Sequence, residues 1–328
     1  MTLPVLSDVS GNYPADAAQR DRWILERRPV REPVDPWLPS AFLVEDERSA
    51  SGEVVPVATI FLTNRECPWH CLMCDLWRHT LREKVPSGAI PFQIDHALKQ
   101  LAPARQIKLY NSGSFFDAQA IPLDDYGPIA QRVNSFDRLI VESHPALLGD
   151  SCLRLRDLLK CRLEVAMGLE TAQPEILSRL NKRMTLEQFS AAAEWLRAND
   201  VDLRVFILLQ PPFMKEHEAV YWAERSLDFA FDCGASVASL IPTRAGNGAL
   251  DELQMLGEFA PPRIQSLEAS VEFGINLNRG RVFADLWNLE RLNRCRTCHP
   301  ARVARLKEMN LRQSITSPIQ CMDCGASD

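Results

Sequence analysis

The chain alternates short apolar runs with amphipathic segments. The apolar runs are aliphatic or β-branched and are bounded by polar residues, Gly or Pro, which predicts buried strands at 55–63, 106–110, 138–142, 163–168, 203–209 and 237–242. Apolar residues at three- and four-residue spacings predict helices at 92–101, 126–134, 186–198 and 218–232. Thr185 and Gln188 supply a capping box for the third of these helices. Six strand–helix units in succession predict an α/β fold whose parallel sheet curls toward a barrel.

Three parts of the chain differ in composition. Residues 1–50 contain many Pro, Arg, Asp and Glu residues, which predicts an extended N-terminal arm packed on the barrel. Residues 51–285 hold the strand–helix units and are predicted to form a partial (β/α)6 barrel. Residues 286–328 are predicted to form a Cys-rich, metal-binding C-terminal extension. In such a barrel, functional side chains are expected at the C-terminal ends of the strands.

Composition narrows the class of protein. A chain of 328 residues with 46% hydrophobic and 24% charged residues is ordinary for a globular protein. The net charge of −6 gives no global electrostatic reason to bind nucleic acid. No signal peptide or membrane span is visible, so a soluble, cytoplasmic protein is expected. Of ten cysteines, seven fall in short metal-type clusters, while Cys152, Cys161 and Cys233 lie in apolar surroundings and are predicted to be core residues.

The first cysteine cluster follows the first predicted strand. Cys67, Cys71 and Cys74 have the spacing C-x3-C-x2-C. Three thiolates in one loop can hold three irons of a [4Fe–4S] cluster and leave the fourth iron open to a small molecule. The alternative is a structural zinc site with His70 or His79 as fourth ligand, although zinc sites usually pair their cysteines as C-x2-C.

This motif resembles the signature of the radical S-adenosylmethionine (SAM) enzymes. The resemblance implies that the three cysteines hold a [4Fe–4S] cluster and that SAM chelates its open iron. It further implies that a flavodoxin or ferredoxin supplies an electron, and that the resulting 5′-deoxyadenosyl radical abstracts hydrogen from a substrate. The fold it implies is the radical SAM partial barrel.

Candidate SAM contacts follow the second and third predicted strands. The turn Asn111-Ser112-Gly113 stands where radical SAM enzymes usually carry Gly-Gly-Glu to hold the amino group of SAM, and Gly113 permits close backbone approach. The alternative is an ordinary strand-to-helix turn. Glu142 ends the next strand and is a further candidate cofactor contact, and His144, just beyond it, is either functional or structural.

Further candidates follow the last three strands. The segment 163–185 resembles the radical SAM enzymes grouped with the elongator catalytic subunit, and this places Glu170 beside the SAM ribose or carboxylate and Lys182 and Arg183 near that carboxylate. The alternative for each cation is a solvated helix end. Gln210 is predicted to project at the active end. Arg244 is either an anion clamp or part of a surface turn.

Two C-x2-C pairs close the chain, Cys295 with Cys298 and Cys321 with Cys324. Their separation is close to that of zinc ribbons, and we expect all four to bind one metal centre. Four thiolates suit either tetrahedral zinc, which we favour, or an auxiliary [4Fe–4S] cluster. The basic residues between the pairs could touch phosphate or form a solvated helix face; they are Arg302, Arg305, Lys307 and Arg312.

The substrate is less defined than the cofactor. The segments 64–77, 108–117 and 163–185 resemble radical SAM proteins related to the archaeosine synthase radical SAM subunit, which acts on a lysine-bearing deazaguanine in transfer RNA. A radical step in small-molecule or peptide natural-product biosynthesis is the alternative. A non-catalytic zinc and RNA-binding protein, or an iron–sulfur electron carrier, would each explain only part of these features.

Overall fold

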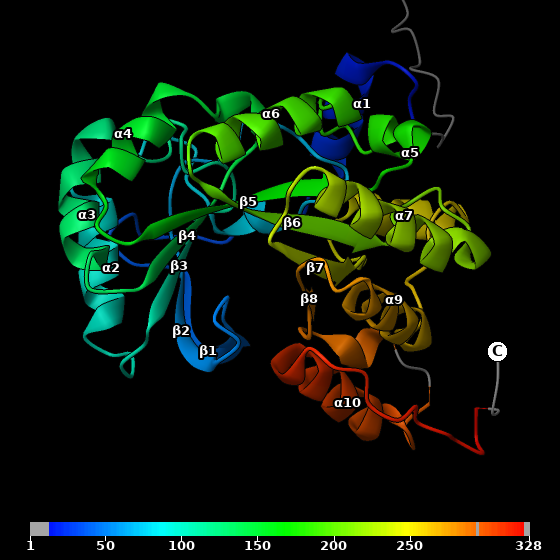
Figure 1. The fold of residues 1–328 in the computed structure, drawn as a ribbon. Helices are drawn as coiled ribbons and strands as arrows, with labels where there is room; N and C mark the ends of the chain where they lie inside the picture. The colour runs from blue at the N-terminus through cyan, green and yellow to red at the C-terminus, as the bar shows by residue number, and fades with distance from the viewer. Residues whose placement is uncertain (1–12, 293–294, 325–328) are drawn as a thin grey trace, which may run out of the picture.

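The computed structural model describes residues 13–292 and 295–324, which form one eight-stranded sheet with helices on its outer face (Figure 1). The strands are β1 (Ala41–Arg48), β2 (Val54–Phe61), β3 (Gln106–Tyr110), β4 (Arg138–Glu142), β5 (Arg162–Glu170), β6 (Asp202–Leu209), β7 (Val237–Pro242) and β8 (Arg281–Ala284). The helices are α1 (Ala17–Arg27), α2 (Ala89–Leu98), α3 (Tyr126–Val133), α4 (Asp150–Leu158), α5 (Pro174–Arg179), α6 (Leu186–Ala198), α7 (Ala219–Asp232), α8 (Ala249–Met255), α9 (Ile264–Leu277) and α10 (His299–Arg312).

The sheet is an open half-barrel. Its strands follow one another in chain order, β2 to β8 are parallel, and β1 pairs antiparallel with β2. Parallel neighbours require crossover connections, and most of these carry a helix. The C-terminal ends of the seven parallel strands therefore meet at one end of the half-barrel, which also receives the loop after β2.

Strand alternation separates an apolar outer face from a polar inner face. The outward residues of β3, β4 and β5, such as Leu109, Val141 and Met167, are fully buried beneath the helices and belong to the main hydrophobic core. The inward residues near the N-terminal ends of the strands are charged instead. A charged inner face is stable here because its members pair with one another across the barrel.

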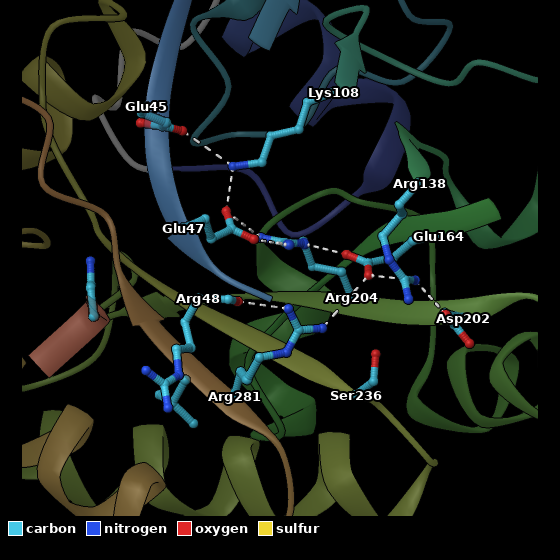
Figure 2. A network of polar contacts seen from close by, with 12 residues as sticks. Glu45, Glu47, Arg48, Lys108, Arg138, Glu164, Asp202, Arg204, Ser236 and Arg281 are labelled. Carbon is cyan, nitrogen blue, oxygen red and sulfur yellow. Dashed lines mark hydrogen bonds and ion pairs between the residues drawn. The ribbon is translucent and has the colours of Figure 1, made fainter. Parts of the chain in front are cut away.

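These inward charges form a floor network, drawn in Figure 2. Lys108 Nζ lies 2.5 Å from Glu47 Oε2 and 3.2 Å from Glu45 Oε1. Arg204 pairs with two carboxylates, that of Glu47 at 2.5 Å and that of Glu164 at 2.6 Å. Four cations and four carboxylates take part: Lys108, Arg138, Arg204 and Arg281 with Glu45, Glu47, Glu164 and Asp202. The network ties β1 to strands on the far side of the half-barrel.

The edge strand β8 is covered by α10. The side-chain amide of Asn310 donates to the carbonyl of Ala284 and accepts from its N–H, at 2.9 and 2.8 Å. Gln313 makes the same pair of bonds with Val282, at 2.8 and 2.7 Å. Side-chain amides thus replace the missing neighbouring strand, which protects an otherwise exposed edge. Helix α10 also contacts β1 and so spans both edges of the sheet.

The partial barrel predicted from sequence is confirmed, with two strands more than predicted. All six predicted strands are present within two residues of their expected ends, and α6 begins and ends as predicted with its capping box formed. The missed strands are β1 and β8. The second half of β1 is Glu-Asp-Glu-Arg, whose inward charges conceal a strand, and β8 is only four residues long.

The described part of the predicted N-terminal arm is not extended throughout. Residues 17–27 form α1, which Asp16 caps by accepting from the N–H groups of Ala18 and Gln19, and 41–48 form β1. Residues 1–12 of the predicted arm lie outside the described residues, as do 293–294 and 325–328 of the C-terminal extension. Among the helices that the structure describes, none has the length and apolar character needed to cross a bilayer.

Candidate active site and metal centre

The loop after β2 carries Cys67, Cys71 and Cys74 at the C-terminal end of the half-barrel. Its base is fixed by backbone hydrogen bonds that join Leu81 to Asn64 and Glu66, at 2.8 and 2.9 Å. The three thiols are partly buried, and burial raises the pKa of each to about 12. Buried thiols of this kind lose their protons when they bind a metal, which then compensates the negative charge. The donor set therefore fits an iron–sulfur cluster.

Two asparagines hold the backbone of this loop. The Asn247 amide donates to the carbonyls of Leu72 and Cys74, at 2.8 and 3.2 Å. The Asn181 amide donates to the carbonyl of His70 at 2.8 Å. Sequence reasoning missed both residues. Asn247 stands between two glycines in a turn after β7, but nothing in that pattern indicates that its amide reaches a loop 170 residues earlier.

His144 lies against the cysteine loop. Its ring stacks on Trp69, with centroids 3.8 Å apart. Nδ1 accepts from the N–H of Ala146, and Nε2 lies 3.0 Å from the carbonyl of Lys182. Burial, together with the charge of Lys182, lowers the pKa of His144 to about 4. The neutral imidazole thus joins the cysteine loop to the segment after α5.

The turn after β3 lies directly against the cysteine loop. A Cβ at Gly113 would lie 3.2 Å from the Cβ of Cys67. Glu142 Oε1 accepts from the N–H of Asn111 at 2.7 Å and of Gly113 at 3.3 Å. Burial raises the pKa of this carboxyl, and the N–H donors oppose the rise. The structure therefore brings Asn111, Ser112, Gly113 and Glu142 together beside the first cysteine.

A buried ion pair lies at the end of β5. Lys182 Nζ is 2.8 Å from Glu170 Oε1, and both side chains are about one-tenth exposed. A Cβ at Gly168 would lie 2.0 Å from that oxygen and 2.7 Å from Nζ, so only glycine leaves room for the pair. Burial alone would lower the pKa of Lys182, but Glu170 and the thiols of Cys71 and Cys67 outweigh it and raise the pKa above its ordinary value. A cation thus stands beside the cysteine loop.

Several polar groups at this end are buried without a hydrogen-bond partner among the described residues. Both amide atoms of Asn111 are in this state, and so is Oε1 of Gln210, whose Nε2 donates to the carbonyl of Ala260. Ser112, Glu170 and Gln210 also have left-handed backbones, with φ of 56°, 67° and 52°. Unpaired polar atoms and strained residues gathered at the ends of three strands are typical of a ligand site. A polar cofactor such as SAM fits this end.

Two of the predicted cations are engaged elsewhere. Arg183 donates to Asp21 and to the carbonyl of Ala17, at 2.8 and 2.7 Å, and so anchors α1. Arg244 pairs with Asp285 at 2.8 Å. Neither arrangement places the guanidinium at the turn after β3.

The four C-terminal cysteines meet in a second site. All four Sγ atoms lie within 4.8 Å of one another. The Sγ atoms of Cys295 and Cys321 are 3.7 Å apart, as are those of Cys298 and Cys324. Arg302 Nε lies 3.3 Å from Cys298 Sγ and can stabilise its thiolate. The four cysteines that the sequence predicted to share one metal centre therefore lie close enough together to hold one.

Two of the four basic residues between the cysteine pairs are internal, whereas Lys307 and Arg312 are exposed. Arg302 and Arg305 are buried and pair with Glu268, and Arg305 also pairs with Glu272 at 2.6 Å. These two residues fasten α10 to α9. The prediction that the segment could touch phosphate is therefore wrong for Arg302 and Arg305, because Glu268 and Glu272 already occupy their guanidinium groups.

Two proteins are similar to this chain in sequence over about three quarters of its length. An uncharacterized protein of Methanocaldococcus jannaschii is 26% identical over 259 residues, which cover 74% of this chain and 70% of that protein. The archaeosine synthase subunit beta of Methanosarcina acetivorans is 24% identical over 262 residues, covering 76% and 73%. No protein-family model matches the chain.

Among solved structures, Streptococcus suis SuiB bound to the precursor peptide SuiA has a similar fold. Its TM-score is 0.50 at 11% identity, with 68% of this chain and 47% of SuiB covered, so the chain spans about half the length of that protein. The half-barrel, the C-x3-C-x2-C loop at its C-terminal end and the similarity to these proteins support the assignment of the chain to the radical SAM superfamily.

Proposed function

We propose that the protein cleaves SAM reductively, with Cys67, Cys71 and Cys74 as ligands of a [4Fe–4S] cluster. The observation that carries the proposal is the contact of the Gly113 turn with Cys67, next to an Asn111 amide that is buried and unpaired. When bound, the cluster supplies the electron that converts SAM to methionine and a 5′-deoxyadenosyl radical.

The protein's own residues would orient SAM and exclude water. We assign the backbone of Ser112 and Gly113 and the Asn111 amide to the amino acid part of SAM. Glu142 fixes that turn through its two N–H bonds. The Lys182 ammonium, held by Glu170, offers a positive charge to the SAM carboxylate and takes the place expected for Arg183. Gln210 Oε1 offers a further acceptor from the β6 end.

We further propose that the substrate is a modified nucleoside in transfer RNA. The name of the archaeosine synthase relative supports this class. Aromatic rings on the inner face suit a planar base: Tyr110 contacts Phe61 and Phe206, with centroids 6.2 and 6.1 Å apart, and Trp287 contacts Phe61 at 6.3 Å. Anaerobic incubation with SAM, reductant and transfer RNA bearing the lysine-modified deazaguanine should change the mass of that nucleoside; an unchanged mass would exclude this substrate.

The cluster assignment is tested by Cys71→Ala. We expect loss of the iron–sulfur absorbance near about 400 nm and of 5′-deoxyadenosine formation, because two thiolates hold a cubane poorly. Cys161→Ala, at a partly buried cysteine outside both metal groups, is the control and should retain both signals. Full cluster content and SAM cleavage in Cys71→Ala would refute the assignment.

For the C-terminal site we propose a single structural zinc ion. Zn–S bonds of about 2.3 Å in a tetrahedron place sulfur atoms about 3.8 Å apart, close to the 3.7 Å found in two pairs. In a cubane each thiolate binds a different iron, and the sulfur atoms lie about 6 Å apart. The separation of at most 4.8 Å among all four Sγ atoms therefore favours one ion over an auxiliary cluster.

Metal analysis of wild type and Cys298→Ala tests this second centre. Zinc should be present at about one ion per chain in the wild type and absent from the variant, with iron unchanged, and the variant should be less stable because metal binding contributes to folding. A fall in iron from about two cubanes to one would instead show an auxiliary cluster. Loss of neither metal would mean that the four cysteines bind none.

A further inference from the structure

A hollow of about 590 Å³ lies on the outer side of the cysteine loop. Cys67 forms part of its wall, together with the loop residues Glu66 and His70 and the segment that leaves α1. The residues proposed for SAM do not line it. Cys67 is thus shared by two faces, one toward the Gly113 turn and the barrel, the other toward this hollow.

The hollow is strongly basic in a chain whose net charge is −6. Four arginines and one carboxylate line it: Arg28, Arg31, Arg65, Arg82 and Glu66. Glu66 accepts from both Arg28 and Arg31, which fixes it to the segment after α1. Within the described part of the chain, the Arg65 guanidinium donates to the neutral amide of Gln119, and neither Arg65 nor the exposed Arg82 has an ion pair with a carboxylate. Two guanidinium groups are therefore available to an acidic partner.

Apolar side chains stand among these charges. Val30 is 91% exposed and Leu25 is 43% exposed, and both line the hollow. Trp77 forms its buried wall and donates to the carbonyl of Cys74 at 3.2 Å. Exposed apolar residues within a ring of charge are typical of a protein-binding surface. A phosphate backbone would need the arginines but not these apolar groups.

We propose that this hollow is the docking site of an acidic one-electron carrier of the flavodoxin or ferredoxin class. The proposal rests on the proposed function, in which the reduced carrier gives one electron to the oxidised cluster and leaves one-electron oxidised. Electron transfer requires close approach to the cysteine loop, and the barrel side is assigned to SAM and substrate. The hollow reaches Cys67 from outside, and its charge would steer an acidic protein toward it.

The test measures binding and electron delivery separately. Calorimetric titration of the holoprotein with oxidised flavodoxin should give an affinity that falls as salt is raised, because the attraction is screened. The double variant Arg65→Glu/Arg82→Glu should bind flavodoxin about tenfold or more weakly at low salt. These two residues leave the Arg28–Glu66–Arg31 contacts intact.

Arg197→Glu is the matched control. Arg197 is exposed on the last turn of α6, just before β6 begins, and therefore lies at the end of the half-barrel opposite the cysteine loop. The variant makes the same Arg→Glu change at one position, which is half of the total change of charge in the double variant, and it should bind flavodoxin as the wild type does. In the double variant, 5′-deoxyadenosine formation should fall with reduced flavodoxin and persist with dithionite, a small reductant that needs no docking surface.

The outcomes are distinct. Equal flavodoxin affinity in wild type and double variant, or binding of neither flavodoxin nor ferredoxin to the wild type, would overturn the docking site. Weakened binding of bulk transfer RNA with unchanged flavodoxin affinity would also overturn it and assign the hollow to RNA. Failure of the wild type to cleave SAM with dithionite would instead contradict the proposed function, while the titration would still report on docking.

Discussion

The two ends of the half-barrel differ in how completely their buried polar groups are paired. At the N-terminal end, the floor network pairs four cations with four carboxylates, and Arg204 and Glu164 are almost wholly buried. At the C-terminal end, Asn111 and Gln210 bury polar atoms without partners, and three residues adopt left-handed backbones. The paired charges at the floor stabilise the fold, whereas the unpaired groups at the other end are open to hydrogen bonds with a ligand. Substitutions at the two ends should therefore affect different properties.

The largest effect is expected at the floor. Arg204→Met leaves Glu47 and Glu164 buried beside fewer cations, and we expect a loss of about 3–5 kcal/mol in the free energy of unfolding. Urea unfolding measures it. The control Arg162→Met removes a half-exposed arginine that pairs with Asp200 and Asp202, and should cost about 1 kcal/mol or less. Equal losses in the two variants would show that the floor is no stronger than a surface pair.

At the other end, Asn111→Ala should weaken SAM binding and leave unfolding nearly unchanged. The side chain has no partner among the described residues, so its hydrogen bonds are expected with SAM, at about 1–3 kcal/mol or roughly 5- to 150-fold in affinity. Equilibrium dialysis and urea unfolding report the two quantities. Asn247→Ala is the contrast, since it removes bonds to the cysteine loop and should reduce stability. Unchanged SAM affinity in Asn111→Ala would contradict the assignment of the Asn111 amide to SAM binding.

A smaller effect is expected from Gly168→Ala. The new Cβ would displace Glu170 and Lys182, and we expect SAM affinity to fall about tenfold, or 1.4 kcal/mol, while the floor network stays intact. Gly127→Ala in α3 is the control, because a Cβ there meets no atom within 4 Å. If both variants bind SAM equally, the ion pair is structural only.

An effect of similar size is expected from acid, as a pH-dependent loss of stability at the floor network. Burial alone would raise the pKa of Glu47, but Arg204 and Lys108 outweigh it and hold the pKa well below its usual range. A depressed pKa in the folded state adds stability that is complete above the unfolded value near about 4.3 and is lost as pH falls. We expect Glu47 to contribute about 1.5 kcal/mol of destabilisation between pH 5 and 3. The free energy of unfolding of Glu47→Gln should depend less on pH in this range than that of the wild type. The same dependence in both proteins would contradict this role of Glu47.

Much of the floor could not be predicted from sequence. Glu45 and Glu47 sit in a run of charged residues that resembles a surface segment, and their partners lie on β3 and β6, more than sixty and one hundred and fifty residues away. The pattern rules assume that inward positions are apolar, so they missed β1. They missed β8 because four residues are too short to show a period.

At the candidate site, the sequence revealed the short motifs but not the contacts between distant segments. Cysteine spacing and the strand-to-turn pattern located the cysteine loop, the turn at Asn111–Gly113 and the C-terminal cysteine pairs, because each is a short segment with its own chemistry. Tertiary structure decided which groups meet: Lys182 rather than Arg183 turns toward the cysteines, His144 stacks on Trp69, and Asn247 holds the loop carbonyls. Those contacts join segments that are far apart in the sequence and are brought together by the fold. The periodicity of residues along the chain does not indicate which distant side chains become neighbours.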